Sequence, residues 1–257
     1  MGGPYSLITE DMTWSYSRVS CFEQCPYQFF LKYITVSKKL PMFFSDYGSF
    51  LHDILSRFYT GQLSKDQLIT YYLANFHSSV RGKAPNQKIY LNYFQQGVEY
   101  LRNISKPAGE IVAVEKSFSF DVDGLPFTGV ADLLIRDGSL VIWDHKARAL
   151  KERSKRGKYT KFDEELDRYL RQLYLYSIAV KNLYGEYPSH LAFNCYRTGQ
   201  IIMEPFLVEG LLSAKAWAID TISRVHLEEK FAPSVDFFRC RYLCDVHDDC
   251  EFYEINS

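Results

Sequence analysis

Three strand-like segments joined by two Asp-Gly turns are the feature that most constrains the fold. The segments are rich in apolar and β-branched residues, and they are Ile111 to Phe120, Leu125 to Ile135 and Leu140 to Lys146. An Asp-Gly pair between two such segments favours a tight hairpin. The pairs at 123–124 and 137–138 therefore predict an antiparallel meander in the middle of the chain.

Helical spacing of apolar residues precedes and follows this meander. We expect helices from Ser17, as N-cap, to about Lys39 with a break at Pro26, then Gly48 to Tyr59, Ser64 to His77, around Leu91 to Leu101, Asp163 to Tyr184 and Val208 to Glu228. Two further strands are expected at His190 to Tyr196 and Gln200 to Phe206. The sequence thus predicts an α/β protein with a mixed sheet core flanked by helices.

The chain has no internal repeat and no low-complexity linker, so one domain over residues 1–257 is the simplest organisation. Its helical part spans about 15–105 and its sheet core about 110–206. A loop-like, Cys-rich tail spans about 232–257. No apolar run reaches bilayer-spanning length and no signal peptide is recognisable, which favours a cytoplasmic protein. In that setting the six Cys are expected to be metal ligands or buried thiols rather than disulfides.

The formal net charge of −1 excludes a global basic field for polyanions, so DNA binding would need a local patch. One candidate patch follows the third strand and consists of Arg148, Lys151, Arg153, Lys155, Arg156 and Lys158. A solvated loop is the alternative interpretation of this run. Aromatic residues make up 16% of the chain, and we expect most of them to fill the core rather than stack on bases.

The third strand ends in Asp144-His145-Lys146, the strongest local signal for chemistry. Because a strand alternates its faces, Asp144 and Lys146 project to the same side. A carboxylate can hold Mg²⁺ while an adjacent ammonium orients or helps deprotonate water, which suits phosphodiester hydrolysis. Asp132 lies within the apolar run of the preceding strand, where a buried carboxylate needs a partner such as a metal.

The loop between these two strands provides a test of this interpretation. A two-residue turn at Asp137-Gly138 would pair Asp132 with Trp143 and point Asp132 away from Asp144. An odd-numbered loop, with Gly138 in the left-handed region, would bring Asp132 to the face of Asp144 and Lys146. A shared metal site therefore requires the odd loop.

Further polar residues fall in a recognisable order along the chain. His52 follows Gly48 by one turn on an expected helix, and Gln172 and Tyr176 lie one turn apart on the long helix. Together with Asp132 and Asp144-His145-Lys146, this order resembles the RecB-like branch of the PD-(D/E)XK nucleases. The segments Ser15-Tyr16-Ser17-Arg18 and Cys25-Pro26-Tyr27 resemble the same branch.

The resemblance implies a restriction-endonuclease-like fold and a DNA exonuclease or end-processing nuclease that needs Mg²⁺ or Mn²⁺. It implies that His52, Asp132, Asp144 and the His145 backbone carbonyl are metal ligands, with Glu115 as a further outer ligand. It makes Lys146 the catalytic lysine, with Gln172 and Tyr176 positioning DNA or the lysine. The substrate would be DNA that is single-stranded or has free ends.

Three cysteines in the tail, Cys240, Cys244 and Cys250, have a spacing typical of metal ligands. The tail resembles the iron–sulfur subgroup of RecB-like nucleases, which includes the AddB nuclease domain and the small CRISPR-associated adaptation nucleases. That resemblance implies a [4Fe–4S] cluster with Cys25 as its fourth ligand, and Cys21 is the alternative fourth ligand. The subgroup usually has C-x₂-C-x₅-C, whereas this tail has one extra residue. Zinc in the same thiolates is the alternative. Cys195, within a strand, is expected in the core.

Two rival functions stay open from the sequence. One is a CRISPR-type adaptation nuclease that acts with an integrase, and the other is a non-catalytic DNA-binding subunit with zinc in its Cys site. The chain lacks a phosphate-binding loop of the G-x-x-x-x-G-K-[ST] type, so unwinding of duplex DNA would need a helicase partner. The full set of Asp132, Asp144 and Lys146 favours an active enzyme.

Overall fold

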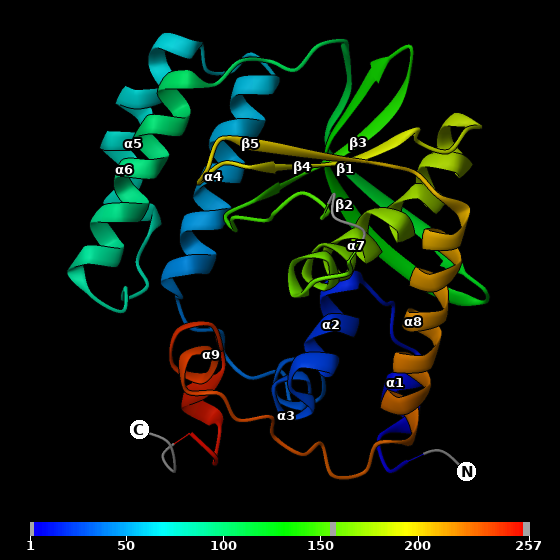
Figure 1. Ribbon diagram of the computed structural model, residues 1–257. Helices are drawn as coiled ribbons and strands as arrows, with labels where there is room; N and C mark the ends of the chain where they lie inside the picture. The colour runs from blue at the N-terminus through cyan, green and yellow to red at the C-terminus, as the bar shows by residue number, and fades with distance from the viewer. Residues whose placement is uncertain (1–2, 155–157, 254–257) are drawn as a thin grey trace.

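The computed structural model describes residues 3–154 and 158–253 and is built around one five-stranded sheet (Figure 1). The strands run in the order β1 (Glu110–Val122), β2 (Leu125–Asp137), β3 (Ser139–Lys146), β4 (His190–Cys195) and β5 (Gln200–Pro205). Neighbouring strands are antiparallel except β3 and β4, which are parallel. The predicted class, a mixed sheet flanked by helices, is confirmed.

One face of the sheet is covered by α7 (Lys161–Tyr184), which forms the crossover from β3 to β4. The helices α1 (Ser6–Glu10), α2 (Tyr16–Gln24) and α8 (Val208–Leu227) pack on the same side. The positions of α7 predicted to face inward are all buried, and they are Leu166, Leu170, Leu173, Ser177 and Val180. Their burial fixes the rotation of α7 and, with it, which of its polar residues reach the sheet edge.

The opposite face carries a second apolar core under α4 (Phe43–Tyr59), α5 (Lys65–Ser79) and α6 (Gln87–Asn103). Figure 1 shows these three helices side by side next to the sheet. The expected capping box begins α5, where the Gln67 side chain accepts from the backbone N–H of Ser64 at 2.9 Å. Aromatic rings fill much of both cores, as expected. No helix in the described part of the chain is long and apolar enough to cross a membrane.

The N-terminal helical segment differs in detail from the expectation. Ser15, not Ser17, caps α2, because its hydroxyl accepts from the backbone N–H of Arg18 at 3.2 Å. The helix breaks before Pro26, as predicted, and the chain continues as α3 (Pro26–Phe29) and a π-helical turn over Phe30–Ile34. Cys25 lies at this break with extended backbone.

The tail is not entirely loop-like, and that expectation was wrong. It contains α9 (Phe237–Tyr242) and a short 3₁₀ turn over His247–Asp249. It lies near α3 at the lower edge of the molecule in Figure 1. Lys32 pairs with Asp245 at 2.9 Å, and Leu31 packs with Val246. Contacts other than cysteines therefore also hold the tail against the N-terminal helices.

Candidate active site

Glu115, Asp132 and Asp144 form a row across strands β1, β2 and β3. In the β1–β2 ladder the pairs on either side of Glu115 place it opposite Asp132. Leu133 pairs with Trp143 in the next ladder, so the same register puts Asp132 opposite Asp144. Gly138 has φ 71°, and the β2–β3 loop is the odd-numbered one. The structure thus has the odd-numbered loop that a shared metal site requires.

His52 reaches this row from α4. Its Nδ1 lies 3.5 Å from Asp132 Oδ1, and its Nε2 lies 2.9 Å from the carbonyl oxygen of His145. The backbone N–H of His145 donates to Asp132 Oδ2 at 2.6 Å. Ligand atoms of His52, Glu115 and Asp132 all lie within 4.8 Å of one another. An open cavity of about 510 Å³, lined in part by Gly48, His52 and Glu115, gives solvent access to this group.

Asp144 and Lys146 form a second group beside the first. Lys146 Nζ lies 2.7 Å from Asp144 Oδ2 and donates to Gln172 Oε1 at 3.0 Å. Gln172 Nε2 in turn donates to the hydroxyl of Tyr176 at 3.4 Å. The Tyr169 ring centroid lies 5.2 Å from the same ammonium. The structure therefore brings Gln172 to the lysine, while the Asp144 carboxylate faces Lys146 and is not part of the three-residue group.

Burial and neighbouring charges shift the pKa values of this site in different directions. Burial raises the pKa of Asp144 to about 6, although Lys146 opposes the shift. Burial also disfavours the charge of Asp132, but the hydrogen bond and charge of His52 hold the pKa of Asp132 below its usual value. The pKa of His52 is raised by Asp132 despite burial, and that of Lys146 is raised by Asp144 despite burial. The lysine is consequently a stable cation.

Two residues of the site were not predicted as functional. Tyr16 is close enough to Lys146 and Asp144 to interact electrostatically, and burial raises its pKa to about 12. The segment Ser15-Tyr16-Ser17-Arg18 was the available signal for it. Asn194, on β4, donates from Nδ2 to His145 Nδ1 at 3.1 Å. Nothing in the local sequence distinguishes Asn194 from an ordinary strand residue.

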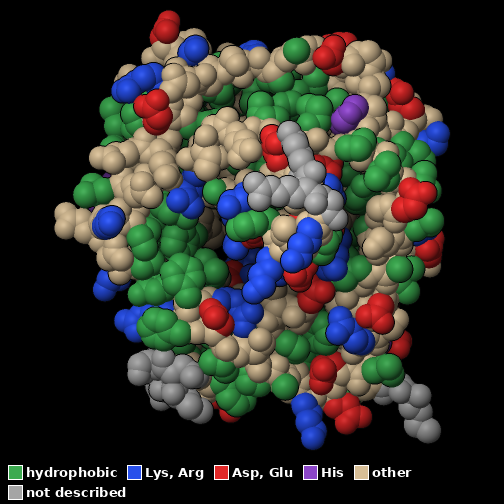
Figure 2. Space-filling model, viewed as in Figure 1, with side chains coloured by type: hydrophobic (Ala, Val, Ile, Leu, Met, Phe, Trp, Pro, Cys, Tyr) green, Lys and Arg blue, Asp and Glu red, His purple; other side chains and the backbone are tan. Residues whose placement is uncertain are grey.

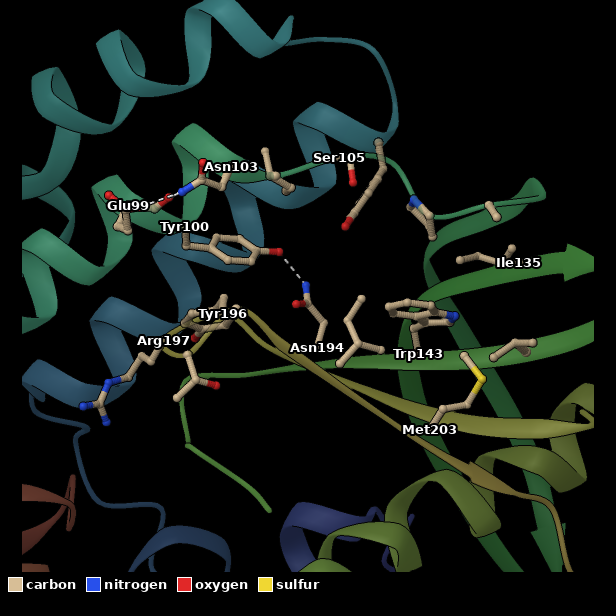
Figure 3. A pocket seen from close by; sticks show the side chains of 18 of the residues that line it. Glu99, Tyr100, Asn103, Ser105, Ile135, Trp143, Asn194, Tyr196, Arg197 and Met203 are labelled. Carbon is tan, nitrogen blue, oxygen red and sulfur yellow. Dashed lines mark hydrogen bonds between the residues drawn. The ribbon is translucent and has the colours of Figure 1, made fainter. Parts of the chain in front are cut away.

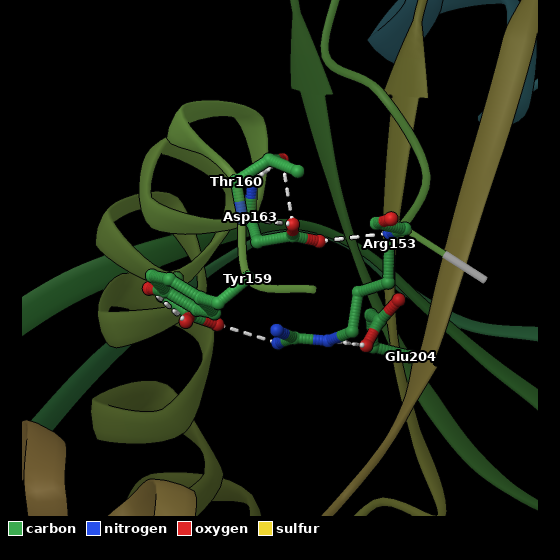
Figure 4. Close-up of polar contacts among 7 residues, drawn as sticks. Arg153, Tyr159, Thr160, Asp163 and Glu204 are labelled. Carbon is green, nitrogen blue, oxygen red and sulfur yellow. Dashed lines mark hydrogen bonds and ion pairs between the residues drawn. The ribbon is translucent and has the colours of Figure 1, made fainter. Parts of the chain in front are cut away.

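Two of the four described residues of the basic run pair with acidic partners. Arg153 pairs with Asp167 and with Glu204 at 2.5 and 2.6 Å, as Figure 4 shows in part. Arg148 pairs with Glu165. Lys151 lies over the Phe162 ring, and Lys158 is exposed. Lys155 and Arg156 lie outside the described residues.

The same polar network anchors the N-terminus of α7. Asp163 accepts from the backbone N–H groups of Ser154 and Thr160 at 2.9 and 2.7 Å (Figure 4). Tyr159 donates to Asp167 at 2.8 Å. The chain on either side of residues 155–157 is therefore tied to α7 and β5.

The four cysteines predicted to share a metal line one small cavity: Cys25, Cys240, Cys244 and Cys250. The Cys25 sulfur accepts from the backbone N–H groups of Gln28 and Ser234, both at 3.4 Å. Among the described residues, the sets of three or more ligand atoms within 4.8 Å of one another include no cysteine. Cys21 is buried in the main core beside this cavity, and Cys195 is buried in the core as expected.

Comparisons with known proteins give a family and a fold. Residues 13–251 match the family described as the PD-(D/E)XK nuclease superfamily. A crystal structure from Eubacterium rectale, described as that of a "putative exonuclease", is similar with a TM-score of 0.54 and 17% sequence identity. The match covers 95% of this chain and 88% of that one. Among curated proteins, none matches. At 17% identity the structural similarity concerns the fold alone.

Proposed function

Since the chain belongs to the PD-(D/E)XK nuclease superfamily, we propose that it is a metal-dependent deoxyribonuclease of the RecB-like branch that digests DNA from free ends. One observation carries the proposal. Three potential ligands, His52, Glu115 and Asp132, converge beside an open cavity, next to the buried Asp144 and its half-buried partner Lys146. That arrangement is what metal-assisted phosphodiester hydrolysis needs.

The donor set fits a hard divalent cation such as Mg²⁺ or Mn²⁺. Two carboxylates and one imidazole lie within 4.8 Å of one another, and the His145 carbonyl oxygen faces the same imidazole at 2.9 Å. Asp144 would complete the set by turning its carboxylate away from Lys146. When bound, the cation would polarise the phosphate and lower the pKa of a water ligand. Glu115 thus becomes a direct ligand in this proposal rather than an outer one.

Lys146 would act as a charged donor. In the metal-free site Asp144 raises the pKa of Lys146, so the lysine would enter the reaction as an ammonium that orients the attacking water or a phosphate oxygen. Gln172 holds the ammonium at 3.0 Å and is itself held by Tyr176. Gln172 and Tyr176 would therefore position the lysine more directly than the DNA.

A DNA strand would approach the metal group through a basic hollow. Figure 2 shows Lys and Arg side chains gathered around a hollow in the region between α4 and α7. This local concentration of positive charge can bind phosphates although the net charge of the chain is −1. From the described basic run, the exposed Lys151 and Lys158 would add to this positive charge. Arg148 and Arg153 would first have to leave their acidic partners. A helicase or an integrase would be the partner for duplex substrates.

The cysteine cavity would hold a [4Fe–4S] cluster that staples the tail to α3. In a tetrahedral zinc site, ligand sulfurs at 2.3 Å from the metal lie about 3.8 Å apart. A cubane keeps its thiolates further apart, because each binds a different iron. No three cysteine sulfurs of the described residues lie within 4.8 Å of one another, so a zinc site would require them to move closer together. Backbone N–H groups directed at the Cys25 sulfur suit a thiolate ligand.

A digestion assay tests the proposed activity. Linear and circular single-stranded DNA of the same sequence are incubated with anaerobically purified protein, with Mn²⁺ or with EDTA. We expect the linear strand to be degraded in Mn²⁺ and the circle to persist. Cleavage of the circle would make the protein an endonuclease, and no cleavage of either strand would contradict the proposal.

A further inference from the structure

A second cavity, of about 570 Å³, lies on the α4–α6 face of the sheet (Figure 3). Four aromatic residues contribute to its lining: Tyr59 of α4, Tyr100 of α6, Trp143 of β3 and Tyr196 in the turn after β4. Side-chain amides of Gln96, Asn103 and Asn194 line it as well. Its volume is in the range of small-molecule sites, which combine an apolar wall with a few polar groups. A site of this kind suits a flat ring with polar edges.

The charges around the cavity disfavour an anionic occupant. Arg197 is the one cation among the described residues that line it, and its guanidinium is already engaged. Arg197 donates to Gln96 Oε1 and to the Tyr93 hydroxyl, each at 2.8 Å. The carboxylates of Glu99 and Asp137 also line the cavity. A neutral group is therefore preferred inside, and any phosphate would stay outside.

Two hydrogen-bonding atoms on the lining residues are unsatisfied. The indole Nε1 of Trp143 and the hydroxyl of Tyr196 are buried without a partner in the described structure. Their residues are only 7% and 1% exposed. Buried polar groups are almost always paired, so these two atoms would gain a partner if a bound molecule displaced the side chains that cover them. Trp143 needs an acceptor, whereas Tyr196 can donate or accept.

We propose that this cavity binds a nucleobase, which combines a flat stacking ring, no charge and an edge of donors and acceptors. The choice of a nucleobase over other heteroaromatic rings rests on the proposed function, because a DNA nuclease meets this ring in every substrate. The base belongs either to the end of a DNA strand or to a free nucleoside.

The cavity is connected to the metal site through His145. Asn194 Nδ2 donates to the Tyr100 hydroxyl at 2.6 Å and to His145 Nδ1 at 3.1 Å, and Figure 3 shows the first of these contacts across the cavity. The Tyr59 and His145 rings stack at 5.7 Å. The backbone carbonyl of His145 faces His52. A bound base would thus be separated from the proposed metal ligands by the Tyr59 and Asn194 side chains that contact His145.

Binding is measured without turnover, in EDTA, by calorimetry and ligand-observed NMR with four nucleosides and with inorganic phosphate. We expect nucleosides to bind wild-type protein with Kd on the order of 0.1–1 mM, and phosphate not to bind. Met203→Trp, which adds a ring at the half-exposed rim, should weaken nucleoside binding at least tenfold. Trp143→Phe, which removes only the indole donor and some ring area, should weaken it severalfold. Leu212→Trp adds a ring at an exposed position of α8 and is the matched control. It should bind nucleosides as wild type does.

A parallel titration identifies the source of the base. An oligonucleotide with a normal terminal base is compared with one whose terminal nucleoside is abasic. A wild-type preference for the normal end that Met203→Trp abolishes supports a strand end, whereas binding of nucleosides alone supports a free nucleoside. The inference is overturned if wild-type protein shows neither nucleoside binding nor a preference for the normal end. It is also overturned if both properties are unchanged in Met203→Trp and Trp143→Phe. DNA cleavage that persists in that case would leave the proposed nuclease activity intact.

Discussion

Glu115 lies opposite Asp132 in the β1–β2 ladder, although its backbone has φ 49° in the middle of a strand. Positive φ is costly for a residue with a side chain, by roughly 1–3 kcal/mol, and such strain is concentrated at functional sites. Here the residue with the left-handed backbone carries a carboxylate whose oxygen lies within 4.8 Å of ligand atoms of His52 and Asp132. The strained backbone therefore lies at the proposed metal site.

This strain predicts an unusual stability order for two variants. Glu115→Gly should be more stable than Glu115→Ala by about 1 kcal/mol, because glycine adopts positive φ without a steric penalty. At an ordinary strand position the order is reversed, since glycine has the larger entropy loss on folding. Urea unfolding of the metal-free proteins measures the difference. If Glu115→Ala is as stable as Glu115→Gly or more stable, the backbone at residue 115 is not strained.

Metal binding should strengthen as pH rises from 6 to 8. The folded pKa of His52 is raised above 6.5 and that of Asp144 is about 6, so near pH 6 these two groups hold protons that a cation must displace. Each displaced proton changes the affinity by roughly tenfold per pH unit below the folded pKa. Calorimetry of Mn²⁺ binding in buffers of different ionisation enthalpy counts the released protons.

The matched comparison uses two histidines. His52→Ala should release fewer protons and bind Mn²⁺ more weakly, whereas His77→Ala, at an exposed position of α5, should behave as wild type. Equal proton release by His52→Ala and wild type would remove His52 from the ligand set.

Much of this site could be predicted from local sequence because strand geometry determines it. Asp144 and Lys146 share a face by alternation, and the Asp137-Gly138 pair limits the loop to a few forms, of which the structure has the odd one. The inward stripe of α7 also follows from spacing, and it places Gln172 beside Lys146.

Other features depend on contacts distant in sequence. The positive φ of Glu115 has no signal in a run of strand-forming residues. The six-residue helix α9 is too short to show a periodic pattern, and the tail that carries it is held by partners such as Lys32, 213 residues from Asp245. Asn194 becomes part of the site only because β4 pairs with β3 in parallel and sets it beside His145.

The cysteine cavity predicts a specific pattern of metal content. Cys25→Ser should abolish bound iron and sulfide in anaerobically purified protein, because Cys25 lines the cavity with the three tail cysteines. Cys21→Ser and Cys195→Ser should retain both, since these thiols lie in the main core. Iron and acid-labile sulfide analysis measures the outcome. Stoichiometric zinc without iron in wild-type protein would show that the cysteines bind zinc and not an iron–sulfur cluster.

The exposed lysines of the basic run predict a salt-dependent contribution to DNA binding. Lys151→Ser with Lys158→Ser should weaken binding of single-stranded DNA and reduce the slope of log affinity against log salt by about 1.4, at roughly 0.7 per phosphate contact. Lys65→Ser with Lys88→Ser makes the same charge change at exposed positions on α5 and α6. An unchanged slope in the first pair would mark the run as a solvated loop.

The central claim is that the acidic row and Lys146 hydrolyse DNA. Single-turnover digestion of a labelled single-stranded oligonucleotide in Mn²⁺ tests it most directly, with wild-type protein compared with Asp132→Asn and Lys146→Ala. We expect each variant to be slower by about 100-fold or more while still binding the oligonucleotide, because each loses a part of the metal and water unit. Wild-type rates in both variants would contradict the claim.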